Sequence, residues 1–352
     1  MKIKQYTLTL LCGLALMTSC KKDDDGGGSP IVERDRTQQQ VIDRDSLLGY
    51  FGTHYYNSDL FLDGNDHSIY DIIITELPKD EEGNYIYEVP DGHTLLSDAL
   101  EAGDIVVHTT VYQETNYEYY VLKLNQGGGE SPTFADDVRL NYVGNLQDAS
   151  IFDSTVNPTD FDLLNLIQGW RLVLPQFSAA TSFVENGDGT TTYINHGLGV
   201  MFLPSGLAYY ASPPIGVTAY SNLIFRFELF QTETNDHDSD GIPSYYEDVD
   251  EDDNVFNDDS DEDDLPNFLD TDDDGDGILT KDEVEAKQYD EDESMNPFTT
   301  KAEAQAYFDN NAGDNEIFVK IEYLITGNYR LHTTILTDSN NDGTPDYLDA
   351  SL

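Results

Sequence analysis

The sequence predicts an α+β fold followed by an acidic, ion-binding region. Residues 138–142 and 223–229 alternate apolar with polar side chains, which is the period of a half-buried β-strand. Residues 34–54 instead place large apolar side chains at helical intervals. From residue 236 onward, acidic residues return at one fixed spacing. We therefore expect strands, a helix and a repeat region within one chain.

The composition limits the functions that the chain can have. Its 352 residues suffice for two or three domains, and 69 Asp and Glu stand against 17 Lys and Arg, a net charge of −52. Such a chain repels nucleic acid phosphates, so we predict no nucleic acid partner. It also repels an anionic membrane surface unless it is anchored there. The 23 Tyr and 16 Phe can build folded cores, which argues against wholesale disorder.

The first residues have the features of an export signal. Residues 1–19 combine lysines, an apolar run too short to span a bilayer, and small residues at their end. Cys20 follows directly, and this arrangement resembles a bacterial lipoprotein signal, which implies cleavage before Cys20 and a lipid on its sulfur. A free thiol beside an ordinary cleavage site is the alternative. Residues 20–45 then form the lipidated cysteine and a flexible tether.

The residues after Cys20 predict where the chain is located. Residues 21–25 read Lys-Lys-Asp-Asp-Asp and resemble the tag that sends lipoproteins to the outer surface in one group of Gram-negative bacteria. We therefore expect an outer-membrane lipoprotein that is surface-exposed or faces the periplasm. Its contact with the membrane would be made through the N-terminal lipid.

Residues 46–116 are expected to form a folded α/β extension ahead of the main module. The helix predicted within residues 34–54 has Asp45 as a candidate N-cap and places Leu47 and Phe51 on one face. Runs rich in Val, Ile, Thr and Tyr predict strands at residues 68–75, 84–89, 104–112 and 117–124. No motif in this extension indicates a function.

Four sequence blocks within residues 117–231 stand in a fixed order. They read VRLNYVGNLQDASIFDS at 138–154, LIQGW at 166–170, LPSGLAY at 203–209 and LIFRFEL at 223–229. In this order they resemble the FKBP family of peptidyl-prolyl isomerases. The resemblance implies an antiparallel sheet wrapped around a short helix, and cis–trans isomerisation of X-Pro bonds in proline-containing polypeptides.

The resemblance also implies a catalytic pocket. Trp170 would be its floor, Asp153 a buried acceptor, and the backbone amide of Ile167 an anchor for a substrate carbonyl. The residues implied are Tyr142, Phe152, Asp153, Phe161, Leu166, Ile167, Trp170, Tyr209 and Phe225. A dry aromatic pocket favours the twisted amide over the planar one, so neither a nucleophile nor a cofactor is required. Each aromatic residue taken alone would more simply be part of a core.

The chain departs from the family pattern at several places. Ala149 and Tyr210 stand where the family has glycine, and the segment from Phe161 to Trp170 is shorter than usual. Gly187-Asp-Gly189, between two apolar runs, predicts a hairpin insertion within residues 182–197. We expect these changes to alter the rim of the pocket.

Residues 232–352 are predicted to be an acidic calcium-binding repeat region. Four segments of twelve residues place acids or Asn at positions 1, 3 and 5 and an acid at position 12, with glycine at position 6 in three of them. They resemble EF-hand loops and the linear thrombospondin type 3 repeats. The ligands expected are Asp236, Asp238, Asp240, Glu247, Asp259, Asp261, Asp263, Asp270, Asp272, Asp274, Asp276, Ile278, Thr280, Glu283, Asp338, Asn340, Asp342 and Asp349. Hard oxygen ligands suit structural Ca²⁺ and not zinc, and a solvated acidic tail is the alternative.

Three hypotheses about function follow from these features. The first is an enzyme, a membrane-anchored prolyl isomerase that helps exported or surface proteins to fold. The second is a catalytically weak FKBP-like binding or chaperone module. The third is a calcium-stiffened surface adhesion or structural lipoprotein. The retained Asp153, Trp170 and Tyr209 favour the first, whereas Tyr210 and the predicted hairpin favour the second.

Overall fold

The computed structural model describes residues 33–289 and 298–351. The chain divides into two compact units, Met1–Arg34 and Asp35–Leu352, and the helices and strands described belong to the second. The predicted export signal and Cys20 lie outside the described residues. The mixed helix-and-sheet class predicted from the sequence is confirmed. No helix among the described residues is long and apolar enough to cross a membrane.

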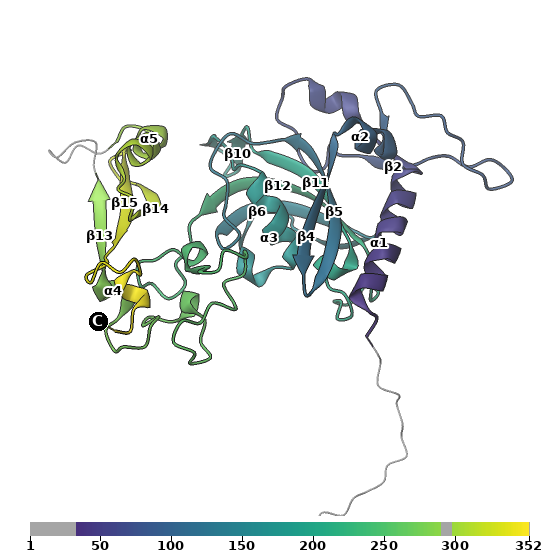
Figure 1. Cartoon of the computed structure of the whole chain (residues 1–352). Coiled ribbons are helices and arrows are strands. Elements are labelled where there is room, and N and C mark those ends of the chain that lie inside the picture. The colour runs from purple at the N-terminus through teal and green to yellow at the C-terminus, as the bar shows by residue number, and fades with distance from the viewer. Residues whose placement is uncertain (1–32, 290–297, 352) are drawn as a thin grey trace, which may run out of the picture. The chain divides into compact units, whose positions relative to one another are not determined.

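The centre of the described unit is a seven-stranded antiparallel sheet (Figure 1). Its order is β4-β5-β11-β12-β6-β7, and β8 also pairs with β6. The strands are β4 Ile105–Tyr112, β5 Thr115–Asn125, β6 Asp137–Asn145, β7 Ile151–Ser154, β8 Thr159–Asp162, β11 Gly197–Leu203 and β12 Leu223–Glu233. The predicted strands at 104–112 and 117–124 are confirmed as β4 and β5. The hairpin joining them places residues of the predicted extension in the same sheet as the predicted module.

One face of this sheet is covered by the short helix α3, Gln168–Val173. Trp170 and Val173 of this helix are buried against sheet residues such as Phe225 and Phe227. A Cβ atom built on Gly169 would collide with the side chain of Leu203 on β11, so glycine permits the close approach of helix and sheet. The 3-10 turns η2 Leu163–Asn165, η3 Leu174–Gln176 and η4 Ser205–Leu207 complete this layer.

The opposite face is covered by helices α1, Arg36–Phe51, and α2, Leu96–Ala102. Phe51 meets Tyr120 and Phe202 of the sheet edge-to-face, with ring centroids 5.1 and 4.8 Å apart. The predicted helix is confirmed, but Asp45 is not its N-cap. Asp35 has the extended backbone of a cap and accepts from the Gln38 amide, so the helix begins ten residues earlier than Asp45 would place it. Residues 36–45, predicted as part of the flexible tether, are therefore helical.

The remaining extension contains less sheet than the sequence predicted. Strands β1 His54–Tyr56, β2 Ile74–Glu76 and β3 Thr94–Leu95 form a small sheet, and η1 spans Ser58–Leu62. The strand prediction at 68–75 was wrong for most of its length, because Asp71 accepts from the backbone and hydroxyl of Ser68 and closes a turn. At 84–89 only an isolated bridge from Tyr85 to Lys79 is present.

The predicted hairpin insertion is confirmed as β9 Ser182–Glu185 and β10 Thr191–Ile194.

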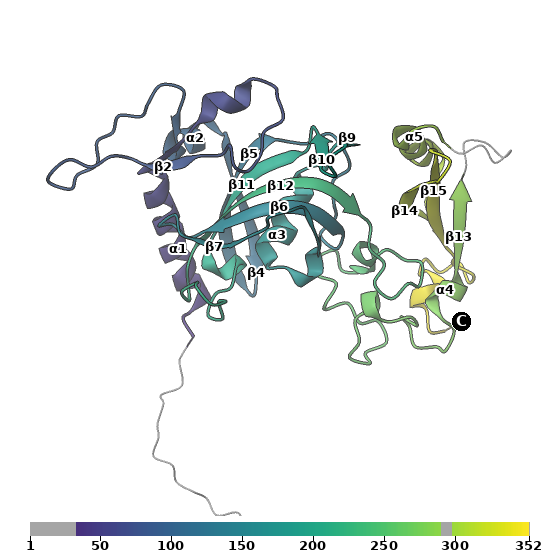
Figure 2. The ribbon, with the colours of Figure 1, turned by 180° about the vertical axis from the view of Figure 1, so that it is seen from behind.

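The C-terminal part contains a second antiparallel sheet that the sequence analysis did not predict (Figure 2). Its order is β13-β15-β14, from Val284–Tyr289, Tyr329–Leu336 and Glu316–Tyr323, and it packs with helix α5, Lys301–Asn311. The acidic loops contain only short turns: η5 Ser244–Glu247, η6 Asn267–Leu269, α4 Thr280–Glu283 and η7 Asp346–Leu348.

Candidate functional site

Aromatic rings from four elements meet on the α3 side of the large sheet. Tyr142 of β6 has its ring centroid 5.6 Å from that of Trp170, 5.9 Å from Phe161 and 6.0 Å from Phe225. The Trp170 and Phe225 rings are 5.0 Å apart. These tilted and edge-to-face contacts are the favoured geometry for aromatic pairs, and they hold the rings in fixed orientations.

A polar group lies at the edge of this aromatic cluster. The hydroxyl of Tyr142 donates a 2.5 Å hydrogen bond to Asp153 Oδ2, and Asp153 Oδ1 accepts from the Ser154 amide. Burial, and then the hydrogen bond to Asp153, raise the pKa of Tyr142 above its ordinary range. The phenol therefore stays protonated at neutral pH and fixes one carboxylate oxygen beside apolar rings.

A glycine beneath the rings is required for this arrangement. The Phe152 and Phe225 rings meet edge-to-face, with centroids 5.6 Å apart. A Cβ atom on Gly144 would lie 2.7 Å from the Phe152 ring and 2.9 Å from the Phe225 ring. Any larger residue at this position would therefore push the two rings away from β6.

The structure brings all of the residues implied by the sequence resemblance together. Trp170 and Phe225 are buried in the cluster, and Asp153 joins it through Tyr142. Asp153 is itself exposed, so the expectation of a buried acceptor was wrong: the carboxylate lies at the rim of the cluster on the short edge strand β7. Half-buried members pack around them: Tyr142, Phe152, Phe161, Leu166, Ile167 and Tyr209. Ile167 is the extended residue immediately before α3. The shortened segment before Trp170 does not displace these residues from the cluster.

Helix α1 holds the loop that carries Tyr209, a contact that the sequence analysis missed. The buried Asp43 carboxylate accepts from both the amide and the hydroxyl of Ser205, at 2.9 and 2.6 Å. The Arg36 guanidinium lies 4.0 Å from the centroid of the Tyr210 ring and donates to the Tyr117 hydroxyl. No local pattern in the helix sequence points to a partner so distant in the chain.

The acidic loops share one backbone conformation. In the loops that begin at residues 236, 259, 272 and 338, positions 4 and 6 have positive φ, whether glycine is present or not. The same pair of angles recurs at Glu251 and Asp253, in a loop that begins at Asp248. The sequence analysis missed this fifth loop because Asp253 replaces the glycine, although Asp248, Asp250 and Asp252 have the expected spacing.

The predicted metal ligands are only partly gathered. Among the described residues, four groups of carboxylates offer oxygens within 4.8 Å of one another: Asp238, Asp240, Glu247 and Asp273; Asp248, Asp250 and Asp252; Asp259, Asp261 and Asp263; Asp272, Asp274 and Asp276. The other predicted carboxylate ligands lie outside these groups, namely Asp236, Asp270, Glu283, Asp338, Asp342 and Asp349. The groups consist of carboxylates alone, so they do not test the predicted ligands Ile278, Thr280 and Asn340. In the last loop Asn340 donates to the Asp349 carboxylate instead.

Asp236 lies outside the group formed by Asp238, Asp240, Glu247 and Asp273. Its two carboxylate oxygens accept from the Ser239 and Gly241 amides and thereby close the turn of the loop. Asp273, by contrast, was not predicted, because it lies at the second position of its loop and not at a ligand position. Only the folded chain reveals it.

Comparisons with known proteins support the sequence resemblance over part of the chain. The chain is 30% identical over 130 residues to the FKBP-type peptidyl-prolyl cis-trans isomerase FkpA of Aeromonas hydrophila, which covers 36% of this chain and 42% of that protein. It is 28% identical over 111 residues to the FKBP-type 22 kDa isomerase of Escherichia coli strain K12, covering 31% and 47%. The chain thus spans less than half the length of these curated relatives.

A solved structure and a family model also match parts of the chain. The crystal structure of FkpA from Escherichia coli shares 26% sequence identity, with a TM-score of 0.30, over 39% of this chain and 54% of that one. Residues 237–323 match the family model described as BamM C-terminal. About a third of the chain is therefore similar to FKBP-type isomerases, and a separate, C-terminal part is similar to another family.

Proposed function

We propose that residues 117–231 catalyse cis–trans isomerisation of X-Pro bonds in exported or surface polypeptides. The observation that carries this proposal is the aromatic cluster around Trp170, in which the Tyr142 hydroxyl holds the Asp153 carboxylate. The similarity to proteins named FKBP-type peptidyl-prolyl isomerases supports the same activity.

The chemistry of the reaction fits such a cluster. Rotation about the X-Pro bond must break amide resonance, a barrier of roughly 18–20 kcal/mol, and uncatalysed exchange takes tens to hundreds of seconds. Water stabilises the planar, polar amide more than the twisted one. Rings such as Trp170 and Phe225 would replace that water, while Asp153 would receive the polar edge of the substrate. The Ile167 amide would hold a substrate carbonyl beside them.

The proposal is tested by the rate of X-Pro exchange in a short peptide. Asp153→Asn replaces the charge-assisted hydrogen bond from Tyr142 by a neutral one, a loss of about 1 kcal/mol, so we expect the catalysed rate to fall roughly fivefold. The matched control is Asp188→Asn, the same change in the exposed turn between β9 and β10. It should leave the rate unchanged.

The outcome of this assay separates the leading hypotheses. If the wild-type chain binds a proline peptide but does not accelerate exchange, the module is a binding or chaperone domain. Tyr210 in place of glycine, held under Arg36, is the observation that favours this second candidate. If the wild-type chain neither binds nor accelerates, both proposals fail.

We further propose that this activity is located at the outer membrane. The lipoprotein-like signal that ends at Cys20 and the match to a BamM C-terminal model support an outer-membrane assembly context. In this proposal the lipid on Cys20 is the membrane contact and the clients are proline-containing polypeptides. Recovery of the Cys20→Ser variant from membranes to the same extent as wild type would contradict it.

Calcium is proposed as a structural ion of residues 232–352, not as a participant in catalysis.

A further inference from the structure

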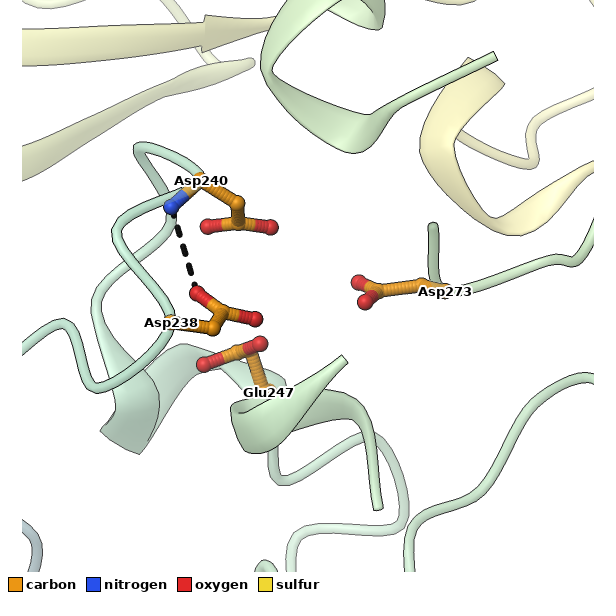
Figure 3. A group of neighbouring side chains, drawn as sticks. All are labelled: Asp238, Asp240, Glu247 and Asp273. Atoms are coloured by element: carbon orange, nitrogen blue, oxygen red, sulfur yellow. Dashed lines mark hydrogen bonds between the residues drawn. The ribbon is translucent and has the colours of Figure 1, made fainter. Parts of the chain in front are cut away.

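Four carboxylates from two different acidic loops converge on one point. Asp238, Asp240 and Glu247 come from the loop at 236–247, and Asp273 comes from the loop at 272–283. Each offers an oxygen within 4.8 Å of the others. Figure 3 shows the Asp273 side chain extending from its own loop toward the other three.

Three of these four side chains are buried, Asp238 is half-buried, and several of their oxygens lack a hydrogen-bond partner among the described residues. The exposed fraction is 0% for Glu247, 1% for Asp273 and 2% for Asp240. Both carboxylate oxygens of Glu247 and both of Asp273 have no hydrogen-bond partner among the described residues, and one oxygen of Asp238 and of Asp240 is likewise unpartnered. Buried carboxylates without partners cost several kcal/mol each, so a cation among them would be strongly favoured.

The donor set selects the cation. All four side chains present hard oxygen ligands, which suit Ca²⁺ and Mg²⁺ and not the nitrogen- and sulfur-rich sites of zinc. Mg²⁺ requires a near-ideal octahedron and retains several waters, whereas Ca²⁺ accepts irregular sets of carboxylates. Four carboxylates from two independent loops form an irregular set, so calcium is the better fit.

Asp273 occupies a position that is not a ligand position of the repeat. The corresponding second residues of the other loops are His237, Val249, Ser260 and Ser339. Thr280 accepts from the Asp273 amide at 3.2 Å through its hydroxyl, which fixes the backbone of Asp273 and leaves its side chain directed away from its own loop. The neighbouring residues Asp272, Asp274 and Asp276 form a separate group.

We propose that Asp273 closes a buried calcium site on Asp238, Asp240 and Glu247, and that the ion thereby clamps two acidic loops together. The clamp also reaches the second sheet. Ile242 donates its amide to Asp240 at 2.8 Å and packs with Ile317 and Leu336, so loss of the ion loosens the contact between the loop and β14–β15. This site is independent of the proposed isomerase activity.

The test compares calcium binding and stability in the full-length chain and its Asp273→Asn variant. Calorimetry with CaCl₂ should show one site lost, or weakened at least tenfold, in Asp273→Asn. The control Asp282→Asn makes the same charge change in the same loop at an exposed residue outside the four groups, and should bind as wild type.

The stability of the Asp273→Asn variant, measured with and without calcium, distinguishes a calcium ligand from a residue that only packs. In chelator, Asp273→Asn removes one of four repelling carboxylates and should unfold at a higher urea concentration than wild type. In saturating calcium the order should reverse, because the variant lacks a ligand. A simple packing defect would instead lower stability in both conditions, and that result would overturn the proposal.

A double variant tests whether Asp238 and Asp273 bind the same ion. Because Asp238 and Asp273 would serve one ion, Asp238→Asn combined with Asp273→Asn should remove no more calcium sites than either change alone. Loss of two separate sites would show that the two residues bind different ions. Equal calcium binding by wild type and Asp273→Asn would also overturn the proposal.

Discussion

Ala149 and Tyr210 stand where the family pattern has glycine, and the structure explains what the glycines would provide. Both residues have positive φ, 65° at Ala149 and 48° at Tyr210. The left-handed region costs an L-residue about 1–2 kcal/mol, whereas glycine enters it freely. The two substitutions therefore preserve the turn at the expense of backbone strain.

Ala149 is exposed, so its strain can be measured without a change in packing. Ala149→Gly should stabilise the chain by up to about 1 kcal/mol, because relief of the left-handed strain exceeds the added entropy of the unfolded state. Urea unfolding at fixed calcium concentration would measure the change. The control is Ala306→Gly, at an exposed residue in the middle of α5 without positive φ, which should lose roughly 0.5–1 kcal/mol. Equal losses for both variants would refute the explanation.

At Tyr210, contacts of the side chain offset the strain of the backbone. Its side chain is 95% buried, with the Arg36 guanidinium over the ring and the Tyr220 ring edge-to-face at 4.9 Å. The contact joins helix α1 to the loop that carries Tyr209. The sequence shows that the glycine of the family pattern is missing. The contact that the tyrosine gains with Arg36 of α1 is seen only in the folded structure.

The metal ligands, too, depend on contacts between parts of the chain that the sequence alone does not show. Spacing alone predicted that Asp272, Asp274 and Asp276 would share a centre, because alternate residues of a tight loop face one point. Asp273 breaks that alternation and serves a different loop. Contacts between loops depend on how the loops pack, and a single sequence contains no signal for that.

At the scale of elements, one ion pair ties the start of β11 to β12. His196 precedes β11, and its Nε2 lies 3.5 Å from the Glu228 carboxylate, with both side chains more than 90% buried. Burial alone would lower the pKa of His196, but the hydrogen bond and charge of Glu228 outweigh it and raise the pKa above its ordinary value.

A raised histidine pKa has a defined effect on stability. The contribution is complete below the unfolded-state pKa of about 6.5 and is lost as the pH rises through the higher folded-state pKa. In saturating calcium, we therefore expect the pair to stabilise wild type more at pH 6 than at pH 8. Glu228→Gln should remove that difference, and NMR should show its His196 titrating at lower pH than in wild type. Identical His196 titrations in both proteins would contradict this account.

The sequence predicted the elements unevenly. Strands with strong alternation and aromatic content, such as β5 and β12, were predicted close to their observed bounds. The run at 68–75 is rich in isoleucine but forms a turn, because Asp71 offers the backbone of Ser68 a local partner. Strand β14 is rich in β-branched and aromatic residues such as Ile317 and Phe318, which is a strand signal that the sequence analysis missed.

At the scale of the whole described unit, the large sheet is buried on both faces. Trp170 and its neighbours cover one face, and Leu47, Phe51 and Leu96 cover the other. The resemblance alone implied only a short helix against the sheet. The N-terminal extension therefore supplies the second hydrophobic layer, which explains its abundance of apolar residues without requiring a separate function.

The net charge of the whole chain affects its association with a membrane. At −52 the chain is repelled by anionic lipid headgroups. In the attachment proposed above, burial of the lipid on Cys20 contributes about 0.8 kcal/mol per CH₂ group, and this contribution does not depend on salt.

This reasoning predicts the behaviour of the chain in membrane fractionation. Wild-type protein should remain with membranes at both low and high salt, because neither electrostatic attraction nor its screening is involved. Cys20→Ser should move the protein to the soluble fraction, whereas the control Cys12→Ser should leave it membrane-bound. Release of wild type by high salt would show that charge holds it there. Mass spectrometry that finds an unmodified Cys20 in the membrane-bound protein would exclude the lipid directly.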